Sequence, residues 1–194
     1  MEPLTEKAKK LIFDFEGIDQ PSDWPGGASG ITIGLGYDLG YESAGDFETD
    51  WQVLLGAGDF TTLSQVVGLK GTDAQAKAPG LKTIKIKSAD AKQVFLERSV
   101  PKYQAQTQQA FPGVDALPAD AQGALFSLVY NRGTSMNGDS RKEMRAIRDA
   151  VPNGDLQEIA NQLRAMKRLW VNKGLDGLLK RRDAEADLVE SCIA

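Results

Sequence analysis

The stretch "GITIGLGYDLGY", residues 30–41, decides the fold of the first part of the chain. It alternates β-branched or aromatic residues with glycines, which is typical of two short strands joined by a tight turn. A single carboxylate, Asp38, stands where the pattern predicts another apolar residue. The register of the hairpin determines which side chains Asp38 meets.

Two hairpin loops fit this stretch, and they place Asp38 on opposite faces. A two-residue loop at 35–36 pairs Thr32 with Leu39. A three-residue loop at 34–36, with its last glycine in the left-handed conformation, pairs Thr32 with Asp38. In the second register the other face pairs only apolar residues, Ile31 with Leu39 and Ile33 with Tyr37. We therefore predict the second register, with Thr32 and Asp38 on a polar face turned away from the core.

Helical periodicity dominates the rest of the chain. Apolar residues spaced by three and four predict a first helix that ends at Glu16-Gly17. Residues 81–87 alternate like a strand, with a loop as the alternative, and Pro101 kinks the helix before it or starts a new one. Further helical segments are expected at 44–55, 60–69, 88–100, 118–131, 140–151, 154–170 and 175–192. The chain is therefore expected to be mainly α, with one small β-hairpin near its start.

Composition limits the chemistry that this chain can perform. Its 194 residues are 41% hydrophobic and 26% charged, as in ordinary globular domains. The absence of histidine excludes Ser-His-Asp and Cys-His catalysis and most zinc sites. Cys192 is the only cysteine, so no intramolecular disulfide forms. If the chain is an enzyme, carboxylates are its acids and bases, and we expect no metal and no cofactor.

Charge is distributed unevenly along the chain. Residues 11–69 contain ten acids and no Lys or Arg, whereas residues 132–182 contain twelve bases and six acids. Two solvated surfaces that balance each other would explain this pattern. The acidic part argues against nucleic-acid binding. No apolar run reaches the length of a membrane span, and the start resembles an amphipathic helix rather than a signal peptide, so we expect no membrane insertion.

Glu16 is the second carboxylate of interest. It closes an apolar helix, where the negative end of the helix dipole disfavours a negative charge by roughly 0.3–1 kcal/mol. A residue placed against its local electrostatics is a candidate for function, although a solvated glutamate before a glycine cap explains the position equally well.

Three segments, in order, resemble the phage-type lysozymes. They are "FEG" followed by "GITIGLGYD", then "ALFSLVYNRG", and finally "LWVNKGLDGLLKRRDAEADLV", and together they extend from residue 13 to 188. The resemblance implies a lysozyme-like α+β fold in a single catalytic domain over 1–194. A small β-containing lobe at about 17–60 and a helical lobe formed by the remainder would then enclose a cleft.

The order of the site departs from the common phage pattern. That pattern puts the catalytic aspartate six residues before the threonine, where this chain has Gly26, with Asp23 the nearest acid. Asp38 instead lies six residues after Thr32. This order resembles pesticin and related lysozyme-like bacterial toxin domains, and we predict Asp38 rather than Asp23 as the second carboxylate.

The resemblance implies hydrolysis of the β-1,4 bond between N-acetylmuramic acid and N-acetylglucosamine in bacterial peptidoglycan. Glu16 would be the general acid, Asp38 the carboxylate that activates or replaces water, and Thr32 the residue that helps to place that water. Cleavage of a glycoside by two carboxylates needs neither histidine nor metal. The retaining or inverting outcome is left open.

Three supporting residues follow from the same resemblance. Tyr37 and Asn131 would bind the substrate, and Arg181 would approach the buried side of Glu16 and hold it in place. For Asn131 a helix cap before Gly133 is an equally good interpretation.

Other functions and partners are compatible with these motifs. A lytic transglycosylase would use Glu16 alone, and a non-catalytic peptidoglycan-binding module would not need the acid. We expect a monomeric enzyme of the cell wall that is made in the cytoplasm and acts in the periplasm or wall of the target bacterium. An endolysin would depend on a holin for export, and an antibacterial effector would be accompanied by an immunity protein.

Overall fold

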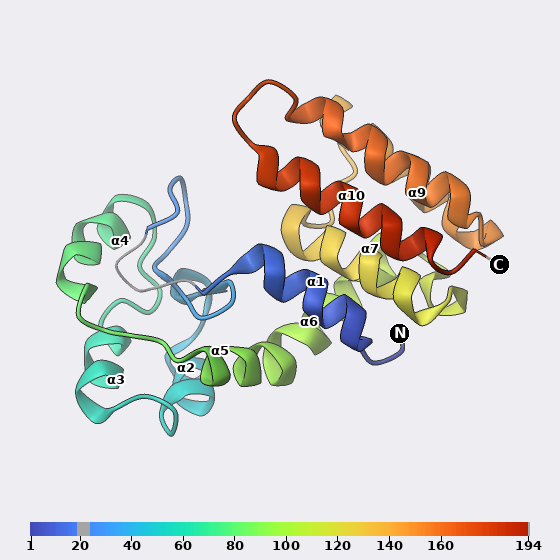
Figure 1. The fold of residues 1–194 in the computed structure, drawn as a ribbon. Coiled ribbons are helices and arrows are strands. Elements are labelled where there is room, and N and C mark those ends of the chain that lie inside the picture. The colour runs from blue at the N-terminus through green and yellow to red at the C-terminus, as the bar shows by residue number, and fades with distance from the viewer. Residues whose placement is uncertain (19–23, 194) are drawn as a thin grey trace. The chain divides into compact units, whose positions relative to one another are not determined.

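A computed structural model describes residues 1–18 and 24–193, and it is mainly helical with one small hairpin (Figure 1). The helices are α1 (Glu6–Glu16), α2 (Ala44–Trp51), α3 (Ala57–Ser64), α4 (Gly71–Lys77), α5 (Ser88–Val94), α6 (Val100–Ala110), α7 (Ala119–Arg132), α8 (Lys142–Ala150), α9 (Leu156–Ala165) and α10 (Asp176–Glu190). The strands are β1 (Thr32–Ile33) and β2 (Tyr37–Asp38). The predicted fold class, mainly α with a small hairpin, is confirmed.

The chain divides into two units, which are described separately below. One unit consists of Met1–Phe15 and Lys102–Ala194, and it is called the helical unit here. The other consists of Glu16–Pro101 and is called the hairpin unit. The hairpin unit thus extends through residue 101, whereas the lobe expected from the sequence ended near residue 60.

The hairpin has the register that the three-residue loop requires. Thr32 is paired with Asp38, and Ile33 with Tyr37, in antiparallel strands. The loop between them ends at Gly36, which has a φ of 68° and lies in the left-handed region that glycine tolerates. The apolar face is buried, since Ile31, Ile33 and Leu39 are each 0% exposed, whereas Thr32 and Asp38 are partly exposed.

Aromatic side chains support the buried face of the hairpin. Trp51, at the end of α2, is fully buried and packs edge-to-face on Tyr37 with ring centres 5.7 Å apart. In the same unit Phe47 stacks on Phe60 at 5.1 Å. Helix α2 therefore packs on the hairpin from its apolar side, and α3 packs on α2.

In the middle of the hairpin unit the loop alternative holds for one segment, and one helix was not foreseen. Residues 82–87 form a turn and irregular backbone rather than a strand, while Ile84 and Ile86 are buried and account for the alternating pattern. Alternation therefore marked the buried side of a loop. Helix α4 was not expected, because "GTDAQAK" has only one buried residue, Ala74, and so no apolar periodicity.

Pro101 is the second residue of α6, in agreement with the alternative in which it starts a new helix. A π-helical turn at Phe95–Ser99 joins α5 to α6, and the N–H of Val100 donates to the carbonyl of Phe95, five residues back. The wider turn accommodates Pro101, which has no N–H to donate to the helix.

The helical unit is built around α7, nine consecutive residues of which are buried. Helix α10 packs against both α7 and α9 (Figure 1). Gly123 of α7 lies so close to α1 that a β-carbon at this position would come within 2.4 Å of the Cβ of Ala8. This close approach requires glycine and fixes α1 on the helical unit.

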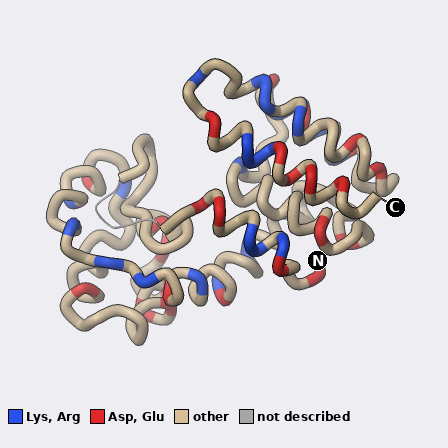
Figure 2. Tube along the Cα trace, viewed as in Figure 1, with Lys and Arg blue, Asp and Glu red and all other residues tan. Residues whose placement is uncertain are grey.

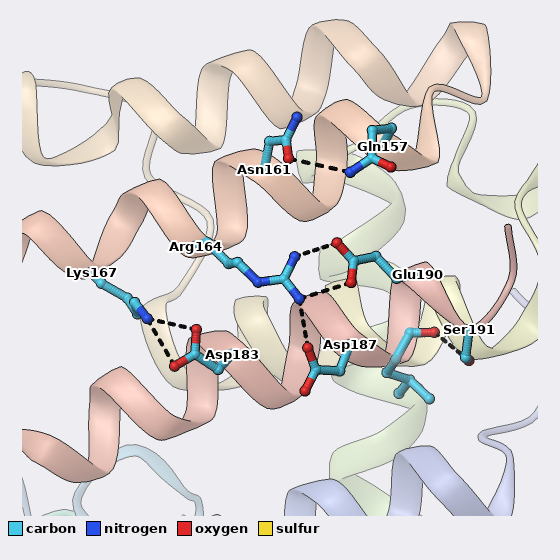
Figure 3. A network of polar contacts seen from close by, with 9 residues as sticks. Gln157, Asn161, Arg164, Lys167, Asp183, Asp187, Glu190 and Ser191 are labelled. Atoms are coloured by element: carbon cyan, nitrogen blue, oxygen red, sulfur yellow. Dashed lines mark hydrogen bonds and ion pairs between the residues drawn. The ribbon is translucent and has the colours of Figure 1, made fainter.

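Ion pairs join α9 to α10 on the surface of the helical unit, where both signs of charge occur (Figure 2). Arg164 binds the carboxylates of Glu190 and Asp187, and Lys167 binds that of Asp183 at 2.7 Å (Figure 3). The carboxylates raise the pKa of Arg164 above its usual value, and the main cause is the hydrogen bond that Arg164 donates to Glu190. Because these groups are partly solvated, the pairs mainly fix the register of the two helices.

Candidate active site

Asp38 is held by backbone groups rather than by a cationic side chain. Its Oδ1 atom accepts hydrogen bonds from the N–H groups of Gly30 and Gly40, both at 2.9 Å. The second of these bonds caps the short 3-10 helix Leu39–Tyr41. Two charge-assisted bonds to one oxygen fix the plane of the carboxylate. The sequence alone did not reveal these donors.

The two glycines leave no room for side chains around Asp38. A β-carbon at Gly30 would lie 2.5 Å from Asp38 Oδ1 and 2.3 Å from the nitrogen of Gly40. A β-carbon at Gly40 would lie 2.7 Å from the carbonyl oxygen of Leu69. The carboxylate therefore sits in a cradle of two closely approaching glycine backbones.

Gly30→Ala tests this cradle. The added methyl group must displace Asp38 or Gly40, so we expect any catalytic activity that depends on Asp38 to fall at least about tenfold, since small misplacements of a reacting group are costly. The free energy of unfolding is expected to drop by about 1–3 kcal/mol, as in other overpacked sites. Activity is measured under conditions in which the variant is fully folded.

Gly45→Ala is the matched control for that variant. Gly45 lies in α2, where a β-carbon would have only one neighbour, at an ordinary 3.9 Å. It is expected to retain full activity and stability. Equal activity of the two variants would mean that the position of Asp38 is unimportant.

Thr32 lies directly opposite Asp38 on the exposed face of the hairpin. Directly opposed residues of an antiparallel pair have Cβ atoms about 4.5–5.5 Å apart. A hydroxyl and a carboxylate at that spacing can bind one water molecule between them. This arrangement is the one that the sequence predicted.

Glu16 is the last residue of α1 and is partly exposed. Gly17 follows with a φ of 63°, the left-handed conformation that commonly ends a helix. Glu16, Thr32 and Asp38 all belong to the hairpin unit. The rival acid Asp23 lies outside the described residues.

Tyr37, which the sequence assigned to substrate binding, is buried with only 6% of its surface exposed. Its hydroxyl donates to Asp50 Oδ2 at 3.0 Å, and Asp50 is also ion-paired with Arg98 at 2.5 Å. These contacts tie β2 to α2 and to the π-helical turn. Its role in substrate binding stays a prediction.

Tyr37→Phe tests the contribution of this buried hydroxyl. Burial, reinforced by the negative charge of Asp50, raises the pKa of Tyr37 well above its usual value of 10. Above about pH 10 the folded state therefore keeps a proton that the unfolded chain releases. The contribution of the protonated Tyr37 hydroxyl to the free energy of unfolding is complete below about pH 10 and is lost progressively as the pH rises above that value. Above that pH the free energy of unfolding falls by up to about 1.4 kcal/mol per pH unit.

Urea unfolding between about pH 8 and pH 11 measures this effect. The stability of the Tyr37→Phe variant is expected to decline less steeply above pH 10 than that of the wild type. Parallel curves would show that Tyr37 does not keep its proton.

The remaining predicted residues belong to a polar network in the helical unit. Asn131 is exposed near the end of α7, and its side-chain oxygen accepts from Arg182 at 3.2 Å. The helix cap is Gly133, whose N–H bonds the carbonyl of Val129, so Asn131 does not cap α7. Arg181 is buried and donates to Ser127 and to Glu185. Substrate binding by Asn131 and support of Glu16 by Arg181 stay predictions.

Two further properties of the structure concern metal binding and the crossing of a membrane. Among the described residues, no group of three or more Cys, Asp or Glu side chains is arranged to hold a metal ion. Within the same part of the chain, every helix is too short or too polar to cross a lipid bilayer.

A model of a known protein family matches the chain. The family model described as phage lysozyme matches residues 59–185, which is well over half of the chain. The matched range includes Asn131 and Arg181 and begins after Glu16, Thr32 and Asp38. No curated protein matches the chain.

Proposed function

Because the chain belongs to the phage lysozyme family, a family of peptidoglycan-degrading glycoside hydrolases, we propose that it is a muramidase. The bond cleaved is the β-1,4 bond between N-acetylmuramic acid and N-acetylglucosamine. The observation that carries this proposal is the pairing of Thr32 with Asp38 on the exposed face of the hairpin, with the carboxylate held by two backbone amides.

The proposed reaction uses two carboxylates in different roles. Glu16 protonates the glycosidic oxygen as the bond breaks. Asp38 stays ionised and either activates a water molecule or attacks the sugar itself. Thr32 shares the water with Asp38 in the first case. The cradle supports this division, because Oδ1 is occupied by the N–H groups of Gly30 and Gly40 and Oδ2 has no protein partner among the described residues.

We also propose that the chain is closer to pesticin-like toxin domains than to the common phage enzymes. The support is the order of the site, in which the aspartate follows the threonine by six residues. The enzyme would act on the wall of a target bacterium, either as an endolysin released by a holin or as an effector paired with an immunity protein. Neighbouring holin or immunity genes would distinguish these two settings.

Turbidity of purified bacterial cell walls tests the proposed activity. The protein is expected to clear the suspension at mildly acidic pH, with and without a chelator, because the two-carboxylate scheme uses no metal. A suspension that the folded protein binds without clearing would indicate a peptidoglycan-binding module instead.

A further inference from the structure

Arg132 and Arg182 lie over the ring of Trp170 in the helical unit, and together with Arg141, whose charge acts on Arg132, they are called the arginine cluster here. The central guanidinium carbon of Arg132 lies 4.8 Å from the centre of the Trp170 ring, and that of Arg182 lies at 5.9 Å. Arg132 ends α7, and Arg141 directly precedes α8. Segments far apart in the sequence therefore bring like charges together, which costs free energy unless negative charge compensates them.

The carboxylates near Arg132 and Arg141 are bound by other arginines. Arg168 binds both Glu143 and Asp139, and Glu185 accepts from Arg181 and from Arg182 of the cluster. In the described part of the chain, neither Arg132 nor Arg141 has a carboxylate partner, since Arg132 donates to the carbonyl of Ser140 and Arg141 to the sulfur of Met144. The cluster thus holds positive charge that the protein itself does not balance.

Arg132 carries the clearest sign of this imbalance. Its Nε atom is enclosed and has no acceptor among the described residues. Burial lowers the pKa of Arg132 to about 10, and the positive charges of Arg141 and Arg182 add to that effect more than Glu143 and Glu185 oppose it. A negatively charged acceptor beside the guanidinium group would offset this excess of positive charge.

We propose that the arginine cluster is a binding site for an oxyanion, the carboxylate or phosphate group of a ligand. A guanidinium group binds such an oxyanion through two parallel N–H bonds. The ring face of Trp170 packs on the plane of the Arg132 guanidinium group, and the edge of that guanidinium group binds the ligand. Arg141 adds charge from the neighbouring turn. The cluster belongs to the helical unit, whereas Glu16, Thr32 and Asp38 belong to the hairpin unit.

Titration with inorganic phosphate and with acetate tests the site, at constant ionic strength maintained with sodium chloride. Calorimetry is expected to show saturable one-to-one binding, and the indole N–H signal of Trp170 in NMR spectra is expected to shift with the same affinity. Binding of both anions indicates a carboxylate-type site, and binding of phosphate alone indicates a phosphate-bearing ligand.

Substitutions locate the binding. Arg132→Gln and Arg141→Gln are each expected to weaken the affinity at least tenfold, and Arg141→Gln serves alone if Arg132→Gln does not fold. Arg148→Gln is the matched control, because Arg148 is exposed on α8 outside the cluster, and it is expected to bind as the wild type does. The proposal is overturned if neither anion binds the wild type saturably, or if both cluster variants bind with wild-type affinity.

Discussion

Asp38→Asn is expected to reduce peptidoglycan hydrolysis at least about a hundredfold, the range for losing an essential charged group of a catalytic pair. The variant is expected to remain folded, because the amide oxygen of asparagine still accepts the N–H groups of Gly30 and Gly40. Its free energy of unfolding is expected to change by only about 1 kcal/mol. Clearing of cell walls and urea unfolding of the same preparation measure the two effects.

This substitution separates the two roles that Asp38 can have. Asp38 caps the short helix Leu39–Tyr41, so the cap alone could explain why a carboxylate stands in the hairpin. A cap needs only an acceptor, which asparagine supplies, whereas the reaction needs the charge. Asp23→Asn is the control for the alternative order of the site, in which the aspartate precedes the threonine. This variant is expected to lose little hydrolytic activity. An inactive Asp23→Asn and an active Asp38→Asn would reverse our assignment.

Glu16→Gln is expected to lower the rate of hydrolysis at least about a hundredfold, because glutamine cannot protonate the leaving oxygen. Removing a negative charge from the C-terminal end of α1 relieves an unfavourable interaction with the helix dipole. The variant is therefore expected to remain folded. The rate is measured on cell walls and the stability by thermal unfolding.

Glu6→Gln is the matched control on the same helix. Glu6 lies in the first turn of α1, is exposed and pairs only with Lys9 nearby. It is expected to keep full activity and to lose a little stability, because a carboxylate at the N-terminal end favours the helix. Substantial activity in Glu16→Gln would remove Glu16 from the mechanism.

The hairpin could be predicted from the sequence because one register alone satisfies every residue of the stretch. Glycines at 34 and 36 permit the three-residue loop, and the apolar pairs then share one face. Local rules of pairing and turn geometry sufficed here. They failed at residues 82–87, where the same alternation belongs to a loop whose buried side is set by distant packing.

The surroundings of the candidate site could be predicted only in part. Glu16, Thr32 and Asp38 are recognisable from their side chains and positions, but the donors that hold Asp38 are backbone groups, which carry no residue-specific signal. An aspartate two residues before a glycine is a weak indication of such a cap. The arginine cluster depends on three segments that meet only in the folded chain, so the sequence gives the surplus of charge and not its location.

The products of wild-type digestion test the central proposal most directly. Purified peptidoglycan is incubated with the protein at mildly acidic pH, and the soluble fragments are analysed by mass spectrometry. Hydrolysis by two carboxylates predicts fragments that have gained one water at each cleaved bond and end in reducing N-acetylmuramic acid. Fragments that end in the anhydro sugar would identify a lytic transglycosylase, and either that product or reducing N-acetylglucosamine ends would contradict the assignment as a muramidase.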